Sequence, residues 1–335
     1  MSLTLARCAT IALILLPFAA LGEPIKLKLA YFTSDRARIY NTAIKPFVDA
    51  VNADEEGGLL IEPYPGGVLG KDPARQAQLV RDGSADIAFV VRGAEASRFG
   101  DHAVIELPGL FRDMREATWV NTRLVASGML QGYEDFFVIG SFASEPETIH
   151  TRLPVASLDD LKGKRIRSNN PIEASALAML GMSPVVLPIG KTSEAISRGT
   201  IDGAATAIGP LIDFGLGRVV TYHYDLRLGP SVRSILMNRK KLESLPRAGQ
   251  DVIRKYSGEW LAARAVDAIE PYTAALFEQL KSDPLRTVVF PSQSEIEVAE
   301  EAFRAVRTEW ANASPHHRLL LSAVEAEILK FRAEY

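Results

Sequence analysis

The sequence has almost no cysteine and lacks any strongly basic segment. Cys8 is the only cysteine of the 335 residues, so the rest of the chain contains neither disulfides nor cysteine metal sites. The net charge is −3, and no cluster of lysine and arginine stands out. Nucleic acid is therefore not an expected partner. After residue 22, no apolar run approaches the roughly 20 residues that span a membrane.

Catalytic and cofactor motifs are also missing. The five histidines form no HExxH pattern, and neither GxSxG nor a Walker A loop is present. Gly66, Gly67 and Gly70 surround a turn without the strand–GxGxxG–helix order that a dinucleotide needs. Asp159 and Asp160 are adjacent, and adjacent residues do not share a helical face. We therefore predict a protein that is not an enzyme and that uses no cofactor or metal.

The N-terminal residues 1–22 have the pattern of a signal peptide. Arg7 supplies a positive charge, residues 9–20 are apolar, and Ala20 and Gly22 place small residues before a cut at Glu23. An uncleaved membrane anchor is the alternative, although the apolar run is short for one. The pattern predicts a mature chain that is exported to the periplasm.

The periodicity of the mature chain predicts an α/β fold. Strands are predicted at 25–32, 59–64 and 86–91, with helices between them, which is the βαβαβ order of an open parallel sheet. A second unit of this kind follows, with strands at 165–167, 185–187 and 201–207. Further strands at 136–142 and 234–237 are predicted to pass between the units. A long helical stretch over 246–280 contains Pro271, which implies a kink or a join.

One stretch, DDLKGKRIRSNN at residues 159–170, is the strongest candidate for a binding site. Arg167 ends a short alternating strand, and Asn169-Asn170-Pro171 then begins a helix. Ligands of α/β sheets bind at such strand ends. A guanidinium there can hold a carboxylate with two parallel hydrogen bonds. The alternative for an arbitrary arginine is a solvated surface residue.

The mature chain resembles, nearly end to end, the substrate-binding subunits of tripartite ATP-independent periplasmic (TRAP) transporters. The segments that carry the resemblance stand in a fixed order, and they are KLAYF, YPGGVLG, LVRDGSADIAFV, ELPGLFRD, SLDDLKGKRIRSNNP, LGMSPVVLPIGKTSEAISRGTIDGAATA and MNRKKLESLP. The variant RFGDHAVIELP, together with IHTRLPVASLDDLKG, is similar to a branch whose members take organic acids.

The resemblance implies roles for several residues. Arg167 maps onto the arginine that forms a salt bridge to the substrate carboxylate, and Asn169 lies beside it. Thr206 stands where the family often has an asparagine that contacts ligand. Phe32 and Thr33, with Tyr31, lie in a loop that commonly lines the pocket. Arg92 is either a second cationic contact or a residue of the pocket rim.

The resemblance also implies a fold, a mechanism and partners. It implies a two-lobe periplasmic binding protein fold with a hinge, exchanged strands and a long helix that spans both lobes. We expect lobe I at residues 24–145 plus 232–270 and lobe II at 146–231 plus 271–335. A monomer would close around a small carboxylate and deliver it to the small and large permease subunits. The alternatives are the binding protein of an ATP-driven transporter, a periplasmic sensor accessory and a periplasmic enzyme.

Overall fold

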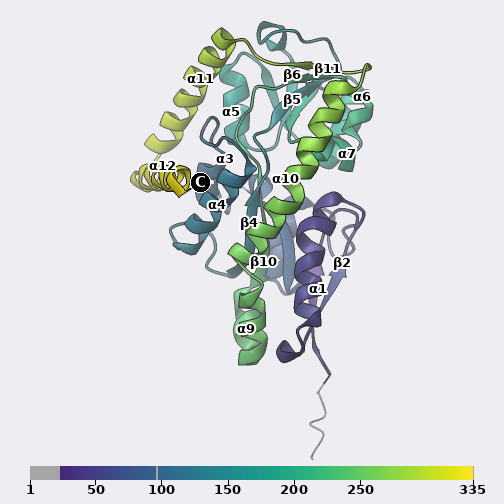
Figure 1. Cartoon of the computed structure of the whole chain (residues 1–335), viewed down its shortest axis with the longest axis vertical. Helices are drawn as coiled ribbons and strands as arrows, with labels where there is room; N and C mark the ends of the chain where they lie inside the picture. The colour runs from purple at the N-terminus through teal and green to yellow at the C-terminus, as the bar shows by residue number, and fades with distance from the viewer. Residues whose placement is uncertain (1–22, 96, 335) are drawn as a thin grey trace, which may run out of the picture.

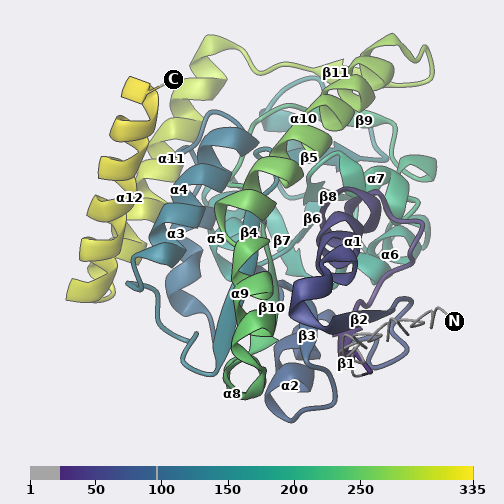
Figure 2. The ribbon, with the colours of Figure 1, turned by 60° about the horizontal axis from the view of Figure 1, so that its bottom comes forward.

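The computed structural model describes residues 23–95 and 97–334, so the predicted signal peptide lies outside the described residues. The described chain forms two sheets (Figures 1 and 2). The first contains, in spatial order, β2 (Leu59–Tyr64), β1 (Ile25–Ala30), β3 (Ile87–Val91), β10 (Val232–Asn238) and β4 (Phe136–Ala143). The second contains β11 (Thr287–Val289), β9 (Tyr222–Tyr224), β5 (Thr148–Thr151), β8 (Gly203–Thr206), β6 (Arg165–Ser168) and β7 (Ser183–Val186).

Helices cover both sheets. They are α1 (Lys45–Ala53), α2 (Gln76–Arg81), α3 (Ala103–Glu106), α4 (Met114–Ala126), α5 (Pro171–Met179), α6 (Thr192–Ser197), α7 (Gly209–Asp213), α8 (Arg239–Ser244), α9 (Arg247–Lys255), α10 (Glu259–Ser282), α11 (Gln293–Asn312) and α12 (Pro315–Glu334). The α/β class with two lobes is confirmed. In Figure 1, α11 and α12 lie on the left, away from α1 and β2 on the lower right.

The first sheet confirms the predicted βαβαβ unit. β1 pairs in parallel with β2 and with β3. β3 has the sequence IAFVV, and its first four residues are buried, as expected for a strand covered on both faces. Pro46 lies at the start of α1, after a π-helical turn at Tyr40–Ile44. The proline occupies a position where its missing N–H is not needed.

The two sheets exchange strands. β10 follows β5 to β9 of the second sheet in the chain, yet it pairs antiparallel with both β3 and β4 of the first sheet. In the second sheet, β5 lies between β9 and β8 and runs antiparallel to both. The chain therefore crosses between the lobes after β4 and again before β10, and these crossings border the space between the sheets.

The long helical stretch is divided at Gly258 rather than at Pro271. Gly258 has φ of +63°, and α10 begins with the next residue. A positive φ suits glycine, because other residues rarely adopt it. α10 continues through Pro271, which removes one helical hydrogen bond without ending the helix. In Figure 1, α10 runs from beside β4 and β10 toward β11, so it spans both lobes.

Close backbone packing explains one glycine of the second sheet. Gly203 begins β8, and a Cβ built on it would lie 2.3 Å from the carbonyl oxygen of His150 in β5. No side chain fits at that distance. Gly203 therefore holds β8 against β5, and Thr206 ends the same strand.

Candidate ligand-binding site

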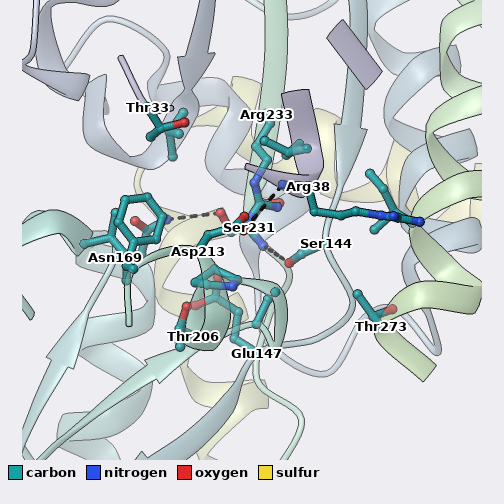
Figure 3. A pocket seen from close by; sticks show the side chains of 18 of the residues that line it. Thr33, Arg38, Ser144, Glu147, Asn169, Thr206, Asp213, Ser231, Arg233 and Thr273 are labelled. Atoms are coloured by element: carbon teal, nitrogen blue, oxygen red, sulfur yellow. Dashed lines mark hydrogen bonds between the residues drawn. The ribbon is translucent and has the colours of Figure 1, made fainter. Parts of the chain in front are cut away.

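A cavity lies between the two sheets, at the ends of their strands. The empty space enclosed by its walls is about 880 Å³, which includes space continuous with solvent. Residues after β1 and at the end of β3 line one side, and residues after β6 and β8 line the other. The crossing segments and α10 complete the walls. In Figure 3, Thr33 lies on the upper wall and Thr206 and Glu147 lie on the lower wall.

Most of the cavity wall is apolar. Its hydrophobic and aromatic members are Tyr31, Phe32, Ile39, Phe89, Val91, Phe142, Ala143, Ile189, Ala207, Pro210, Phe214, Ile269 and Tyr272. Tyr31 and Phe89 are in edge-on contact, with ring centroids 5.3 Å apart. This arrangement suits a ligand with a hydrophobic body and few polar groups.

Arg167 lines the cavity and is held on three sides. Its Nε donates to the carbonyl of Leu187 at 2.8 Å, Nη1 to that of Ala205 at 3.2 Å, and Nη2 to Oδ1 of Asn169 at 3.0 Å. A guanidinium has five N–H donors, so two remain without a partner among the described residues, one on each terminal nitrogen. Two such donors match the two oxygens of a carboxylate. Only 2% of Arg167 is exposed, so a bound carboxylate would be largely dehydrated.

Buried carboxyl groups compensate part of the Arg167 charge. Burial lowers the pKa of Arg167, and the Glu173 and Glu147 carboxyls oppose that change. Burial also raises the pKa of Glu173 well above its ordinary value, and the adjacent Glu147 carboxylate raises it further. One oxygen of Glu173 accepts the backbone N–H of Asn169 at 2.6 Å, which fixes the turn after β6.

The structure brings five of the six predicted residues to this cavity. Arg167, Asn169, Thr206, Phe32 and Thr33 all line it. The Asn169 amide also donates to the Ser231 hydroxyl at 3.3 Å, as Figure 3 shows. The Thr33 hydroxyl is buried without a hydrogen-bond partner in the described part of the chain. Whether each residue contacts a ligand stays a prediction.

Arg92 is placed elsewhere. It is not among the residues that line the cavity, and only 1% of it is exposed. Its guanidinium carbon lies 4.1 Å from the Phe99 ring centroid and 4.4 Å from that of Tyr133, and Nε donates to the Ser234 hydroxyl at 2.9 Å. These two aromatic rings turn the side chain away from the strand end, so we do not retain Arg92 as a ligand contact.

Five charged residues that line the cavity were missed from the sequence, namely Arg38, Glu145, Glu147, Asp213 and Arg233. Arg233 is the second residue of β10 and lines the cavity. It shares a strand face with Ile235, and this alternation was the available signal, but the strand was predicted to begin at Ser234, the residue after Arg233. Glu147 lies on the crossing between β4 and β5. No local pattern marks a buried acid in a crossing segment.

No metal centre or membrane-spanning helix is found in the described chain. Among residues 23–95 and 97–334, no group of three or more His, Cys, Asp or Glu could hold a metal ion. Within the same residues, no helix combines the length and the apolar character needed to cross a bilayer.

Two α/β lobes with a buried arginine in the cavity between them define a two-lobe solute-binding protein. Residues 29–313 match the family described as bacterial extracellular solute-binding protein, family 7 (DctP). This match covers most of the chain, and the chain belongs to that family. It is a family of transport proteins rather than of enzymes, and the TRAP resemblance is confirmed.

Solved structures show the same fold. A TRAP solute-binding protein of Rhodoferax ferrireducens with copurified benzoate is 23% identical, with a TM-score of 0.85, and covers 91% of this chain and 98% of its own. One from a marine metagenome, with metahydroxyphenylacetate, is 25% identical, with a TM-score of 0.83 and coverage of 91% and 99%. One from Bordetella bronchiseptica, with (R)- and (S)-mandelate, is 21% identical, with a TM-score of 0.82 and coverage of 92% and 100%.

Proposed function

We propose that this chain captures a small monocarboxylate with a hydrophobic body and delivers it to a TRAP permease. The observation that carries the proposal is Arg167, which lines a largely apolar cavity and has two N–H donors without a partner among the described residues. The ligands of the three similar structures support it, because benzoate, hydroxyphenylacetate and mandelate each join one carboxylate to an aromatic ring.

Capture proceeds by closure of the two lobes. Arg167 reaches the cavity from the second sheet and Arg233 from the first. A carboxylate held between the two guanidinium groups binds the closed arrangement more tightly than the open one, and this difference shifts the population toward closure. The lobes are residues 24–145 plus 232–270 and residues 146–231 plus 271–335. Sheet membership supports this division, because β10 joins the first sheet and β11 the second.

The closed protein docks on a permease made of a small and a large membrane subunit. We propose that the chain acts as a monomer in the periplasm, after removal of residues 1–22, and that it does not turn over its ligand. The family description places these proteins outside the cytoplasm. Mass spectrometry of the exported protein should show a chain that begins at Glu23, and a lipid on Cys8 or an intact Met1 would contradict this.

A ligand screen tests the function. We expect aromatic and aliphatic monocarboxylates to raise the thermal unfolding temperature, because a ligand that binds only the folded state stabilises it by RT ln(1 + L/Kd), where L is the free ligand concentration. Calorimetry then gives the affinities, and chromatography of each acid after long incubation should recover it unchanged. If no carboxylate shifts the unfolding temperature while uncharged sugars do, the proposed ligand class is wrong.

A further inference from the structure

Arg38 marks the mouth of the cavity. Of the residues that line the cavity, only Arg38 and Asp213 are exposed. Arg38 lies between β1 and α1 of the first lobe, and Asp213 ends α7 of the second. The backbone N–H of Arg38 donates to Oδ1 of Asp213 at 3.4 Å. The two lobes therefore meet at Arg38, on the rim where the cavity is continuous with solvent.

The Arg38 guanidinium is held at this rim without being neutralised. Its carbon lies 4.5 Å from the centroid of the Tyr272 ring, which belongs to α10. Figure 3 shows the side chain in an extended form. An aromatic face attracts a cation and leaves its N–H donors free. Among residues 23–95 and 97–334, this guanidinium makes no hydrogen bond and no ion pair.

The three arginines that line the cavity form a series of decreasing exposure. Arg38 is exposed, Arg233 is half-buried, and Arg167 is only 2% exposed. None of the three forms an ion pair with a carboxylate of the described residues, and Arg233 donates only to the carbonyl of Ser231, at 3.2 Å. Positive charge that is free to act on an anion therefore extends from the rim to the buried anchor.

The buried anchor is poorly placed to attract a solute from solution. An anion must lose much of its water before it reaches the Arg167 guanidinium, and that loss is costly. An exposed cation at the rim attracts the anion while it is still hydrated, because a unit charge acts over several ångströms in water. A lower energy of the anion at the rim lowers the barrier to its entry. A rim arginine thus acts on the rate of binding, whereas the buried arginine acts on its strength.

We propose that Arg38 is the entry residue of the site, whose charge draws the solute carboxylate to the mouth and speeds its passage to Arg167. This inference rests on the proposed function, because it assumes an anionic solute that is anchored at Arg167. It assigns the two arginines separate tasks. Arg167 holds the bound carboxylate, and Arg38 sets the association rate constant, kon.

Charge variants of Arg38 test the inference. Stopped-flow mixing of the mature protein with benzoate or mandelate gives kon. At an ionic strength of about 0.02 M, Arg38→Ala should lower kon about two- to three-fold, the effect of one unit charge over about 7 Å of water. Arg38→Glu should lower it about four- to nine-fold, because it reverses the charge. Arg38→Lys should keep it, because this attraction needs the charge and not the planar fork.

Salt and a neighbouring arginine provide the controls. At about 1 M salt the screening length falls to about 3 Å, so the differences in kon should vanish. Arg36 is exposed and belongs to the same segment, but it does not line the cavity, and Arg36→Ala should change kon by less than about 1.5-fold. Substitution of Arg38 leaves its backbone bonds in place, because Asp213 accepts its N–H and the Thr42 hydroxyl donates to its carbonyl at 3.0 Å.

The outcomes separate the inference from the proposed function. If the two acids bind, Arg167→Ala weakens them and kon is the same for wild type, Arg38→Ala and Arg38→Glu, the inference fails and the proposed function stands. A difference in kon that persists at about 1 M salt, or that Arg36→Ala reproduces in full, also overturns the inference. A faster dissociation with unchanged kon would make Arg38 a contact of the bound solute instead. If no monocarboxylate binds, or Arg167→Ala leaves the affinity unchanged, the proposed function fails and the inference fails with it.

Discussion

Asn169 donates its side-chain amide to the hydroxyl of Ser231 over 3.3 Å, and this contact connects the two sides of the cavity. Asn169 follows β6 of the second sheet, and Ser231 precedes β10 of the first. The same amide accepts a hydrogen bond from Arg167 on its oxygen. The guanidinium that we assign to the carboxylate is therefore coupled to the segment that leads from the second sheet back to the first.

Arg167 should supply most of the carboxylate affinity. Removing one partner of a buried, hydrogen-bonded charge pair costs about 2–5 kcal/mol, which is at least tens-fold in affinity. Arg167→Ala should therefore bind far more weakly by calorimetry. Arg167→Lys should recover only part of the loss, because an ammonium keeps the charge without the two-pronged geometry.

Arg165 is the internal control for this experiment. It lies on the same strand, but its Nη2 pairs with Asp202 at 3.0 Å and donates to the carbonyl of Gly199 at 2.8 Å, and it is not among the cavity residues. Arg165→Ala should leave ligand affinity within a few-fold of wild type. The opposite pattern, with Arg165 essential and Arg167 dispensable, would show that we have assigned the carboxylate to the wrong arginine.

Ligand binding should make the protein more compact. The two arginines that reach the cavity from different sheets favour closure when a carboxylate lies between them. Small-angle scattering with saturating ligand should give a smaller radius of gyration than scattering without it. Arg233→Ala should reduce the change, and a scattering curve that is the same with and without ligand would contradict closure.

Thr206 should affect the specificity for particular acids more than the overall affinity for acids. It ends β8 and lines the cavity, and its side chain is short. Thr206→Asn adds an amide that can donate or accept in the same place. We expect the rank order of a panel of acids to change in calorimetry. Affinities that are all unaltered would mean that this side chain does not contact the ligand.

Glu106 should give the stability of the protein a distinct pH dependence. Burial raises the pKa of Glu106 from 4.5 to about 8, and one of its oxygens accepts the N–H of Val232 at 3.2 Å. Between these two pKa values the folded state keeps a proton that the unfolded state releases. This contribution to the free energy of unfolding is fully present below about pH 4.5 and is lost as the pH rises through about 8.

Glu106→Gln isolates this effect, because an amide resembles the protonated acid and does not titrate. The free energy of unfolding of the variant, minus that of wild type, should rise by about 1.4 kcal/mol per pH unit across the window and then level off. Urea denaturation of both proteins from pH 5 to 9 measures the difference. Parallel pH profiles for the two proteins would show that Glu106 titrates alike in the folded and unfolded states.

Local patterns in the sequence determined the α/β class, most strands and the position of Arg167. Apolar residues repeat with the period of a strand or a helix because each element buries one face, and that information lies within a few neighbouring residues. The run IAFVV predicts buried β3, and the Asn-Asn-Pro turn predicts that a helix follows Arg167. The family resemblance added Asn169, Thr206, Phe32 and Thr33, all of which line the cavity.

Only the tertiary structure decided which distant residues share the cavity. Arg233 and Glu147 reach it because β10 inserts between β3 and β4 and because the crossing segments hydrogen-bond to each other. Arg92 directly follows β3 and so also lies at the end of a strand, as Arg167 does. Phe99 and Tyr133 nevertheless hold its guanidinium away from the cavity. These outcomes depend on contacts between segments far apart in the chain, and the periodicity of any one segment carries no information about them.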